Sequence, residues 1–204
     1  IARLRKFVKR EPIHLAGDLS DGLFGIASGS VHVSLPRHDG VNCTVLRSGV
    51  GFWTGELGLF RRHVQLTSVC AAEPTRAIHL PGARLQRLLL EMPSLVDDVF
   101  DLIHENAGLM LRLLASFSEG KLDQRVAGRL VMELDARGDA EGWISLSQFE
   151  LAEMLAVSQP TIQRCLQRLA SRGLVRLGYS RVQVADRGAL ECDRFGGDEV
   201  VPVG

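Results

Sequence analysis

Five arginines and no acidic residue lie between Gln159 and Arg181. Arginine presents several N–H groups in one plane, which suit phosphate oxygens and the acceptor pair of guanine. A segment with this charge pattern favours contact with DNA. For Arg168 and Arg172, a helix face exposed to solvent is an equally good interpretation. The full set of arginines in the segment is Arg164, Arg168, Arg172, Arg176 and Arg181.

Two short helices joined by a tight turn are predicted to position these side chains, between Ser147 and Leu169. Apolar residues recur at helical spacing on both sides of the turn. Ser147 and Glu150 form a capping-box pattern, which predicts the start of the first helix. Ser158 is the expected cap of the second helix, and Pro160 suits its first turn, where a missing N–H costs nothing. This layout is typical of a helix-turn-helix.

Small residues and a predicted wing support that interpretation. Ala152 and Ala156 are small where we expect the two helices to approach each other closely. The residues from Gly173 to Val184 contain an apolar run and the sequence Gly-Tyr-Ser, which predict a two-stranded wing. The alternative is an ordinary helical hairpin in a protein core, and the wing and the charge pattern both favour DNA over it.

The composition sets limits on the class of protein. The chain has 204 residues, enough for one large domain or two small ones. Its formal net charge is zero, so the basic character is confined to the segment described above. No apolar run approaches the ~18 residues that a membrane helix requires. No signal-peptide pattern is visible, and we expect further residues before Ile1.

The cysteines and histidines show no metal-binding pattern. The four cysteines form no CxxC pair, which argues against a zinc knuckle or an iron–sulfur cluster and favours free thiols in a reducing cytoplasm. Cys70 and Cys165 are predicted to be buried. A haem or metal sensor is a disfavoured alternative, because no histidine lies at ligand spacing from a cysteine. The histidines are His14, His32, His38, His63, His79 and His104.

The first half of the chain alternates short apolar segments with turn signals. Residues 31–35 alternate with the period of two that a half-buried strand requires, and 64–70 and 76–80 look similar. Turn signals separate them, including one at 37–40. Many short strands at close spacing favour a β-barrel or roll. Residues 52–60 interrupt this pattern with glycines at a strand end and a possible helical turn, which could seat an anion.

The segments GDLSDGLFGIASGSVHV, GELGLF and TSVCAAEPTRAIHL resemble the β-roll of the CRP/FNR family of bacterial transcription regulators. The predicted helix-turn-helix lies at the distance that the family leads one to expect, so the resemblance covers nearly the whole chain. GELGLF matches the family's phosphate-binding cassette. In cyclic-AMP-binding members its glutamate, Glu56 here, holds a ribose hydroxyl. The resemblance therefore implies an effector pocket, with the candidates Gly55, Glu56, Leu57, Gly58, Gln65 and Thr67.

The chain departs from that family at the position that binds the cyclic phosphate. Cyclic-AMP-binding members carry an arginine there, and Gln65 stands at the matching position. Glutamine lacks the charged, two-pronged fork that makes a phosphate contact strong. Arg61 and Arg62 lie nearby in sequence, where a solvated pair is the expected interpretation. We predict that the roll does not bind cyclic AMP tightly.

A long helix is predicted from Ser94 to about Ser118, after a short amphipathic helix at 83–91. Its length would be about 36 Å at 1.5 Å per residue. One apolar set alternates spacings of four and three, which is a heptad seam for a second helix. A second set, Val99, Leu102, Leu109 and Leu113, lies off the seam and would pack on the roll. The predicted dimer seam is Val96, Phe100, Ile103, Ala107, Met110, Leu114 and Phe117.

The family's long helix also presents a Thr-Ser pair to the ligand base. The matching positions fall near Arg112 and Leu113, so no such pair is present. This is a second mark against cyclic AMP. The segment 118–121 is the predicted linker between domains, followed by Asp123, which matches the family's hinge aspartate and is predicted to cap the next helix.

The resemblance also assigns roles within the second helix of the motif. Arg164 matches the family's base-reading arginine, and Ser158 and Thr161 match phosphate-contacting positions. Gln159 replaces an arginine and Pro160 replaces a glutamate that reads cytosine, so a different half-site is expected. Gln163 faces the same way, and wing residues would clamp phosphates. The candidate DNA contacts are Ser158, Gln159, Thr161, Gln163, Arg164, Arg168, Tyr179 and Arg181.

We therefore predict an α+β chain with three parts. These are an N-terminal antiparallel, jelly-roll-like β-roll at 1–93, a dimerisation helix and hinge at 94–121, and a winged helix-turn-helix at 122–204. The expected function is a cytoplasmic, homodimeric transcription regulator that binds double-stranded DNA and RNA polymerase. Loss of the phosphate-binding arginine leaves three alternatives open: no effector, a small-molecule effector other than cyclic AMP, or control by abundance alone. No cofactor, metal or catalytic residue is predicted. The alternative is a sensor that regulates a protein partner without reading DNA.

Overall fold

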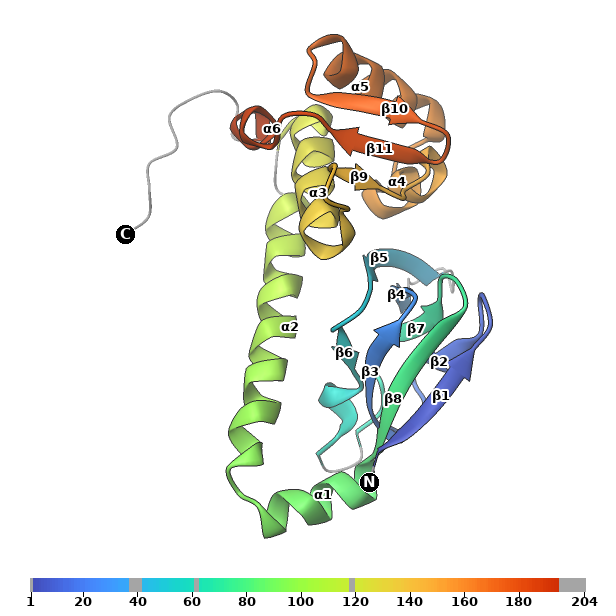
Figure 1. Cartoon of the computed structure of the whole chain (residues 1–204), viewed down its shortest axis with the longest axis vertical. Coiled ribbons are helices and arrows are strands. Elements are labelled where there is room, and N and C mark those ends of the chain that lie inside the picture. The colour runs from blue at the N-terminus through green and yellow to red at the C-terminus, as the bar shows by residue number, and fades with distance from the viewer. Residues whose placement is uncertain (1, 37–41, 61–62, 118–119, 195–204) are drawn as a thin grey trace. The chain divides into compact units, whose positions relative to one another are not determined.

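The computed structural model describes residues 2–36, 42–60, 63–117 and 120–194. The predicted turn at 37–40, the pair Arg61 and Arg62 and part of the predicted linker lie outside these ranges. The chain divides into two compact units, residues 1–111 and 112–204. The first unit is mainly β and the second is mainly helical, which confirms the α+β class (Figure 1).

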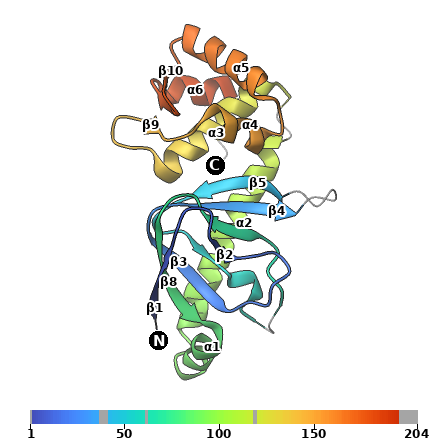
Figure 2. The same cartoon turned by 90° about the vertical axis from the view of Figure 1, so that its right-hand side faces the viewer.

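The first unit contains two antiparallel four-stranded sheets within its described residues (Figures 1 and 2). One sheet has the order β1-β8-β3-β6 and the other has the order β2-β7-β4-β5. Strands β3 and β8 form the longest pairing of the first sheet, from Gly22 opposite Pro81 to Ser28 opposite Arg76. The strands are β1 (Arg3–Phe7), β2 (Pro12–His14), β3 (Gly22–Ser28), β4 (Val31–Pro36), β5 (Asn42–Ser48), β6 (Trp53–Thr54), β7 (Ser68–Ala71) and β8 (Thr75–Pro81).

Alternation along the strands explains the core of this roll. Val31 and Val33 of β4 are buried, as are Thr75 and Ala77 of β8, while their neighbours are half-buried or exposed. One face of β4 and one face of β8 therefore lie in the core, as the period of two requires. The predicted strand at 64–70 is wrong at its start, because β7 begins at Ser68. The first strand, β1, carries mostly exposed charged residues and was not predicted.

Two helices pack against the first sheet. Helix α1 (Gly82–Glu91) and helix α2 (Leu95–Phe117) confirm the two predicted helices. Leu85 and Leu89 of α1 and Val99 of α2 form a cluster with Leu23 of β3 and Leu59. Val99 therefore packs on the roll, as predicted. Cys70 is only half-buried, so its predicted burial is wrong.

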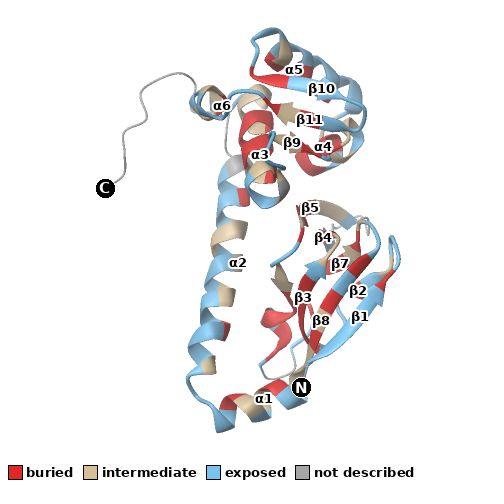
Figure 3. Cartoon of the chain, in the orientation of Figure 1, coloured by how far each residue is buried: buried red, intermediate tan, exposed pale blue. Residues whose placement is uncertain are grey.

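The predicted dimer seam on α2 is divided between solvent and the roll. Val96, Phe100 and Leu114 are exposed by 43%, 64% and 65%, and Ala107 is also exposed. Ile103 instead packs against the cluster on the roll, and Met110 is half-buried. The side chain of Phe117 lies outside the described set. Figure 3 shows exposed and half-buried residues along most of α2.

The second unit is a helical domain with a small antiparallel sheet of order β10-β11-β9. Every helix and strand of this unit contributes to its buried core, in which Leu130, Leu151, Ile162 and Leu166 are fully buried. Strand β9 was not predicted, and it adds a third strand to the predicted wing. The elements are α3 (Leu122–Arg137), β9 (Trp143–Ile144), α4 (Gln148–Leu155), α5 (Gln159–Ser171), β10 (Val175–Gly178), β11 (Arg181–Val184) and α6 (Arg187–Arg194).

Candidate functional site: a nucleic-acid interface and a roll cavity

Helix α4 begins where the sequence predicts. The Glu150 backbone N–H donates to Ser147 Oγ at 3.1 Å, and the Ser147 N–H donates to Glu150 Oε2 at 2.8 Å. This reciprocal pair is a capping box, which satisfies two backbone donors that the first turn leaves free. The start of the helix-turn-helix is therefore fixed by two side chains only three residues apart.

The turn between α4 and α5 uses an alanine in a left-handed conformation. Ala156 has φ of 55° and ψ of 43°, and its N–H donates back to α4. Its side chain is exposed, whereas Ala152 is buried. The prediction that both alanines allow close helix packing is therefore wrong for Ala156. A left-handed residue here ends α4 and redirects the chain into α5.

The N-terminal half of α5 has a buried side and an exposed polar side. Ile162 is buried in the core, while Gln159, Gln163 and Arg164 are exposed and Thr161 is half-buried. Ser158 occupies the predicted cap position and Pro160 lies in the first turn. The Ser158 hydroxyl, however, lies 2.8 Å from Thr161 Oγ1 and makes no capping bond to the backbone. Both hydroxyls therefore lie beside the start of the exposed face.

Arg164 has a guanidinium that is held less tightly by other side chains than that of Arg168, the other arginine of α5. Its Nη2 lies 3.5 Å from Thr161 Oγ1, which is at the outer limit of a hydrogen bond. Such a weak contact leaves the donors of the guanidinium available at the exposed surface. The structure therefore places Arg164 beside Gln163 and Thr161 on one accessible face.

The C-terminal half of α5 differs, because its arginines are held by carboxylates. Arg168 Nε donates to Asp123 Oδ2 at 2.9 Å, and its Nη2 donates to Asp123 Oδ1. Arg172 Nη2 lies 2.6 Å from Asp193 Oδ1 of α6. The arginine fork lowers the pKa of the Asp123 carboxyl below its usual value. Neither carboxylate is near these arginines in sequence.

Asp123 therefore does not cap α3, and that prediction is wrong. Lys121 holds the cap position, and its backbone N–H donates to Gln124 Oε1 at 3.1 Å. Asp123 instead also accepts from the Cys165 thiol, with Sγ 2.9 Å from Oδ1. Burial, followed by the neighbouring carboxylate, raises the pKa of Cys165 to about 12. Cys165 is buried as predicted and stays a thiol at neutral pH.

The wing presents an aromatic tip and a stacked arginine. Tyr179 is 97% exposed at the turn between β10 and β11. The Arg181 guanidinium lies 4.1 Å from the centre of the Trp143 ring of β9, which is a cation–π contact. Trp143 thus holds the guanidinium end of the Arg181 side chain at the edge of the wing.

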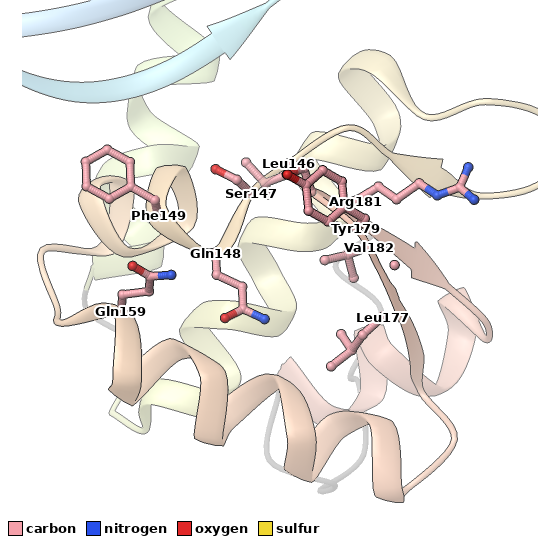
Figure 4. A pocket seen from close by; sticks show the side chains of 11 residues that line it. Leu146, Ser147, Gln148, Phe149, Gln159, Leu177, Tyr179, Arg181 and Val182 are labelled. Atoms are coloured by element: carbon pink, nitrogen blue, oxygen red, sulfur yellow. The ribbon is translucent and has the colours of Figure 1, made fainter.

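A groove of about 270 Å³ separates the wing from the starts of α4 and α5 (Figure 4). Gln148 and Phe149 of α4 and Gln159 of α5 line it beside Tyr179 and Arg181. The groove brings three of the predicted DNA contacts together. Gln148 and Phe149 were not predicted, although an aromatic residue two positions after the capping serine was a signal that could have found them.

A cavity of about 230 Å³ lies in the first unit, and we call it the roll cavity. Five of the six candidate effector residues line it. Gly58 does not, because it packs against Ser20. Sequence reasoning missed the contribution of β6. It placed the ligand-facing positions of α2 near Arg112 and Leu113, whereas neither of these residues lines the cavity. The lining is Val33, Phe52, Thr54, Gly55, Glu56, Leu57, Gln65, Thr67, Ile103, Asn106, Ala107 and Met110.

Glu56 is a buried carboxylate in the wall of the roll cavity. It is 6% exposed, and Asn106 Nδ2 donates to its Oε1 at 2.9 Å. Burial raises the pKa of Glu56 above its usual value, and the Asn106 bond opposes that effect. Gly55 before it has φ of 95°, and a Cβ there would meet the Gly22 carbonyl oxygen at 2.2 Å. Only glycine fits at this turn.

Gln65 is buried in the same wall, at 3% exposure. Its Nε2 has no hydrogen-bond partner among the described residues. Its backbone is held on both sides, since its N–H donates to the Asp18 carbonyl and its carbonyl accepts from Gly17, both at 2.8 Å. The backbone at Gln65 is therefore held in place, and its buried side-chain amide has an unused donor.

No group of three or more His, Cys, Asp or Glu side chains in the described ranges could hold a metal ion. Every helix that the structure describes is too short or too polar to cross a bilayer.

Two domain families match the two units. Residues 4–92 match the cyclic nucleotide-binding domain family, and residues 124–192 match the Crp-like helix-turn-helix domain family. A cyclic AMP receptor protein of Thermus thermophilus is 31% identical over 195 residues, covering 94% of this chain and 88% of that protein. A CRP-like cAMP-activated global transcriptional regulator of Mycobacterium tuberculosis is 23% identical, covering 88% and 83%.

Solved structures share the fold. The structure of FixK2 from Bradyrhizobium japonicum has a TM-score of 0.79 at 18% identity, covering 99% of this chain and all of that one. A CRP/FNR-family transcriptional regulator from Thermus thermophilus has a TM-score of 0.76 at 21% identity, covering 95% and 98%. Sequence and fold agree over both units, and the chain belongs to the CRP/FNR family of transcription regulators.

Proposed function

We propose that this regulator binds double-stranded DNA as a homodimer at a pseudo-palindromic site. The observation that carries the proposal is the exposed polar face of the first half of α5, which is set rigidly on a buried core. In a helix-turn-helix the start of the second helix contacts base edges in the major groove. Two copies of α5 would enter successive major grooves about 34 Å apart.

The exposed residues suggest specific roles. Arg164 would pair with guanine, and Gln159 and Gln163 with adenine, because their donors and acceptors match those base edges. Ser158, Thr161, Tyr179 and Arg181 would contact the phosphate backbone. Arg168 would reach phosphate through Nη1, since Asp123 engages its Nε and Nη2.

An apolar stripe on α2 would form the dimer contact. Val96, Phe100, Ala107 and Leu114 of the predicted seam are exposed, and Leu111 beside them is exposed by 65%. Exposed residues of this size on one helix face are typical of a surface that pairs with a second helix. Phe117 would extend the stripe, while Ile103 and Met110 serve the first unit. The functional parts of the chain would be the β-roll at 1–93, the dimerisation helix and hinge at 94–121, and the DNA-binding domain at 122–204.

The first unit would bind a small-molecule effector other than cyclic AMP. Two of the relatives are named for cyclic AMP, and in that ligand a phosphate carries the charge. Gln65 offers an amide where the family's arginine would pair with that phosphate.

Binding of the effector would shift the hinge near Asp123 and re-aim the DNA-binding helices, as a change in population between two states. The DNA-bound protein would contact RNA polymerase in the cytoplasm.

The test is a selection of bound sequences from random duplexes, followed by binding of the best site at several salt concentrations. A two-fold symmetric consensus and a steep fall of affinity with salt are expected, because each phosphate contact releases a counterion. Light scattering on the full chain should give the mass of two chains. Failure to enrich any sequence would favour the other candidate, a sensor that regulates a protein partner without reading DNA.

A further inference from the structure

The roll cavity contains polar groups whose charge and size select a class of ligand. Its described lining holds one carboxylate, from Glu56, and no lysine, arginine or histidine. The other polar groups are the amides of Gln65 and Asn106 and the hydroxyls of Thr54 and Thr67. An anion entering this cavity would meet a like charge, with no compensating cation among the described lining residues.

Gln65 supplies a donor that lacks an acceptor. The residue is 3% exposed, and Nε2 has no partner among the described residues. That nitrogen lies 3.6 Å from the position of a Cβ on Gly55, which also lines the cavity. Buried donors are nearly always paired, because leaving one unpaired is costly. Less than 1 Å² of Nε2 is accessible, so the amide must turn about its last side-chain bond to present this donor to a ligand in the cavity.

Glu56 supplies acceptors close by. Asn106 donates to Oε1 at 2.9 Å, and Asn106 also donates to the Trp53 carbonyl at 3.0 Å. The backbone N–H groups of Gly55 and Glu56 also donate to this carboxylate. A carboxylate offers about four acceptor sites, so these three bonds leave about one for a donor from a ligand. Asn106 holds the carboxylate in position from α2. One wall thus presents a donor from Gln65 and acceptors from Glu56.

Thr54 is oriented from behind by a buried histidine. His14 Nε2 lies 2.9 Å from Thr54 Oγ1. Burial lowers the pKa of His14 to about 4, so the ring is neutral at pH 7. The neutral ring adds no positive charge behind the wall, and it fixes the rotamer of a hydroxyl that lines the cavity.

The size of the cavity adds a second restriction. Its volume of about 230 Å³ matches roughly eight water molecules by their share of liquid volume. Sites for drug-sized ligands usually measure about 300–1,000 Å³. The cavity therefore suits a molecule about as large as one sugar ring, with apolar walls from Phe52, Ile103 and Met110.

We propose that the roll cavity binds an uncharged, hydroxyl-rich molecule the size of a single sugar ring, and that it rejects anions. A hydroxyl both donates and accepts, so it satisfies Glu56 and Gln65 together. This inference rests on the proposed control of the protein by an effector in the first unit.

The test compares matched neutral and anionic probes on the full chain. Calorimetry and thermal shift are measured with neutral pentoses and hexoses, and with ribose 5-phosphate, glucose 6-phosphate and inorganic phosphate. At least one neutral sugar should bind with a dissociation constant in the millimolar range or below. Its phosphorylated partner should bind at least tenfold more weakly. Tighter binding of the anion overturns the proposal, and so does the absence of binding by every neutral probe.

Variants at Gln65 test the mechanism. Gln65→Leu should lose most of the affinity for the neutral sugar, whereas Gln65→Arg should gain binding of the phosphorylated sugar. Gln86→Leu is the matched control, because the Gln86 amide donates to the Leu59 carbonyl and does not line the cavity. If the arginine variant does not fold by circular dichroism, the wild-type probes and Gln65→Leu still decide. Unchanged sugar affinity in Gln65→Leu contradicts the proposal.

DNA binding on the same samples separates this inference from the proposed function. A wild-type chain that binds its selected DNA site but no neutral sugar overturns only the ligand class. A chain that prefers neutral sugars but binds no DNA overturns only the proposed DNA recognition.

Discussion

The two halves of α5 carry the same kind of side chain in different settings. In the first half, the described contacts of Arg164 are limited to a long one with Thr161. In the second half, Arg168 and Arg172 are bound to Asp123 and Asp193. A count of charges along the sequence treats all three alike. In the structure, only the first half of α5 has an arginine whose guanidinium is not bound to a carboxylate among the described residues.

The difference assigns separate tasks to the two halves. The paired arginines tie α5 to α3 and α6, and Arg187 of α6 is tied to Asp135 of α3 with Nη1 2.7 Å from Oδ1. Three ion pairs thus connect three helices around the core. The second half of α5 holds the helix in place, and the first half is left to contact a ligand.

Replacing Arg164 should have the largest effect. Arg164→Ala removes a fork that suits guanine, so specific affinity should fall by about 1–3 kcal/mol, with relaxed preference at one base pair. Fluorescence anisotropy on the selected site and its single-base variants measures both. Arg187→Ala removes the same charge from α6 and serves as the control. Equal weakening on every sequence would show that Arg164 contacts only phosphate.

Releasing Arg168 should have a smaller and opposite effect. Asp123→Asn weakens the hold on the fork, so Arg168 gains freedom to contact phosphate. Non-specific affinity should rise, and the slope of log affinity against log salt should steepen by about 1. Asp135→Asn removes an equal charge beside Arg187 and controls for net charge. A slope that stays the same in Asp123→Asn would mean that Arg168 does not reach DNA even when released.

The Asp123 pair should also appear in the pH dependence of stability. The folded-state pKa of Asp123 lies below its unfolded value of about 3.9, so the stabilising effect is present above that value. It is lost as the pH falls through the folded pKa. Urea unfolding of the wild type and Asp123→Asn should therefore differ at pH 7 and converge in acid. A gap that widens as pH falls would contradict the assignment.

Sequence patterns predicted local features well and distant pairings poorly. The capping box of Ser147 and Glu150 was predictable because both partners lie within one turn. Asp123 and Arg168 are 45 residues apart, and no periodicity brings them together. The same holds for Glu56 and Asn106, 50 residues apart, so the helix side of the roll cavity was missed. Strands β1 and β9 were missed because one is charged and the other has two residues.

Ala156 tests how firmly the turn fixes the first half of α5. A left-handed conformation costs an ordinary residue roughly 1–2 kcal/mol, and glycine adopts it freely. The greater conformational entropy of glycine in the unfolded chain opposes this gain by roughly 0.4–1 kcal/mol. Relief of the strain is the larger effect, so Ala156→Gly should raise the free energy of unfolding by about 0.5 kcal/mol. Ala152→Gly, buried within α4, should lower it. Thermal unfolding of the full chain measures both.

The effect of Ala156→Gly on DNA binding then bears on the division within α5. The ion pairs of Arg168 and Arg172 hold the helix from its far end, so relief of strain at the turn should leave specific affinity unchanged. A more stable variant with weaker specific binding would show that the left-handed alanine, and not the paired half of the helix, sets the orientation of Arg164.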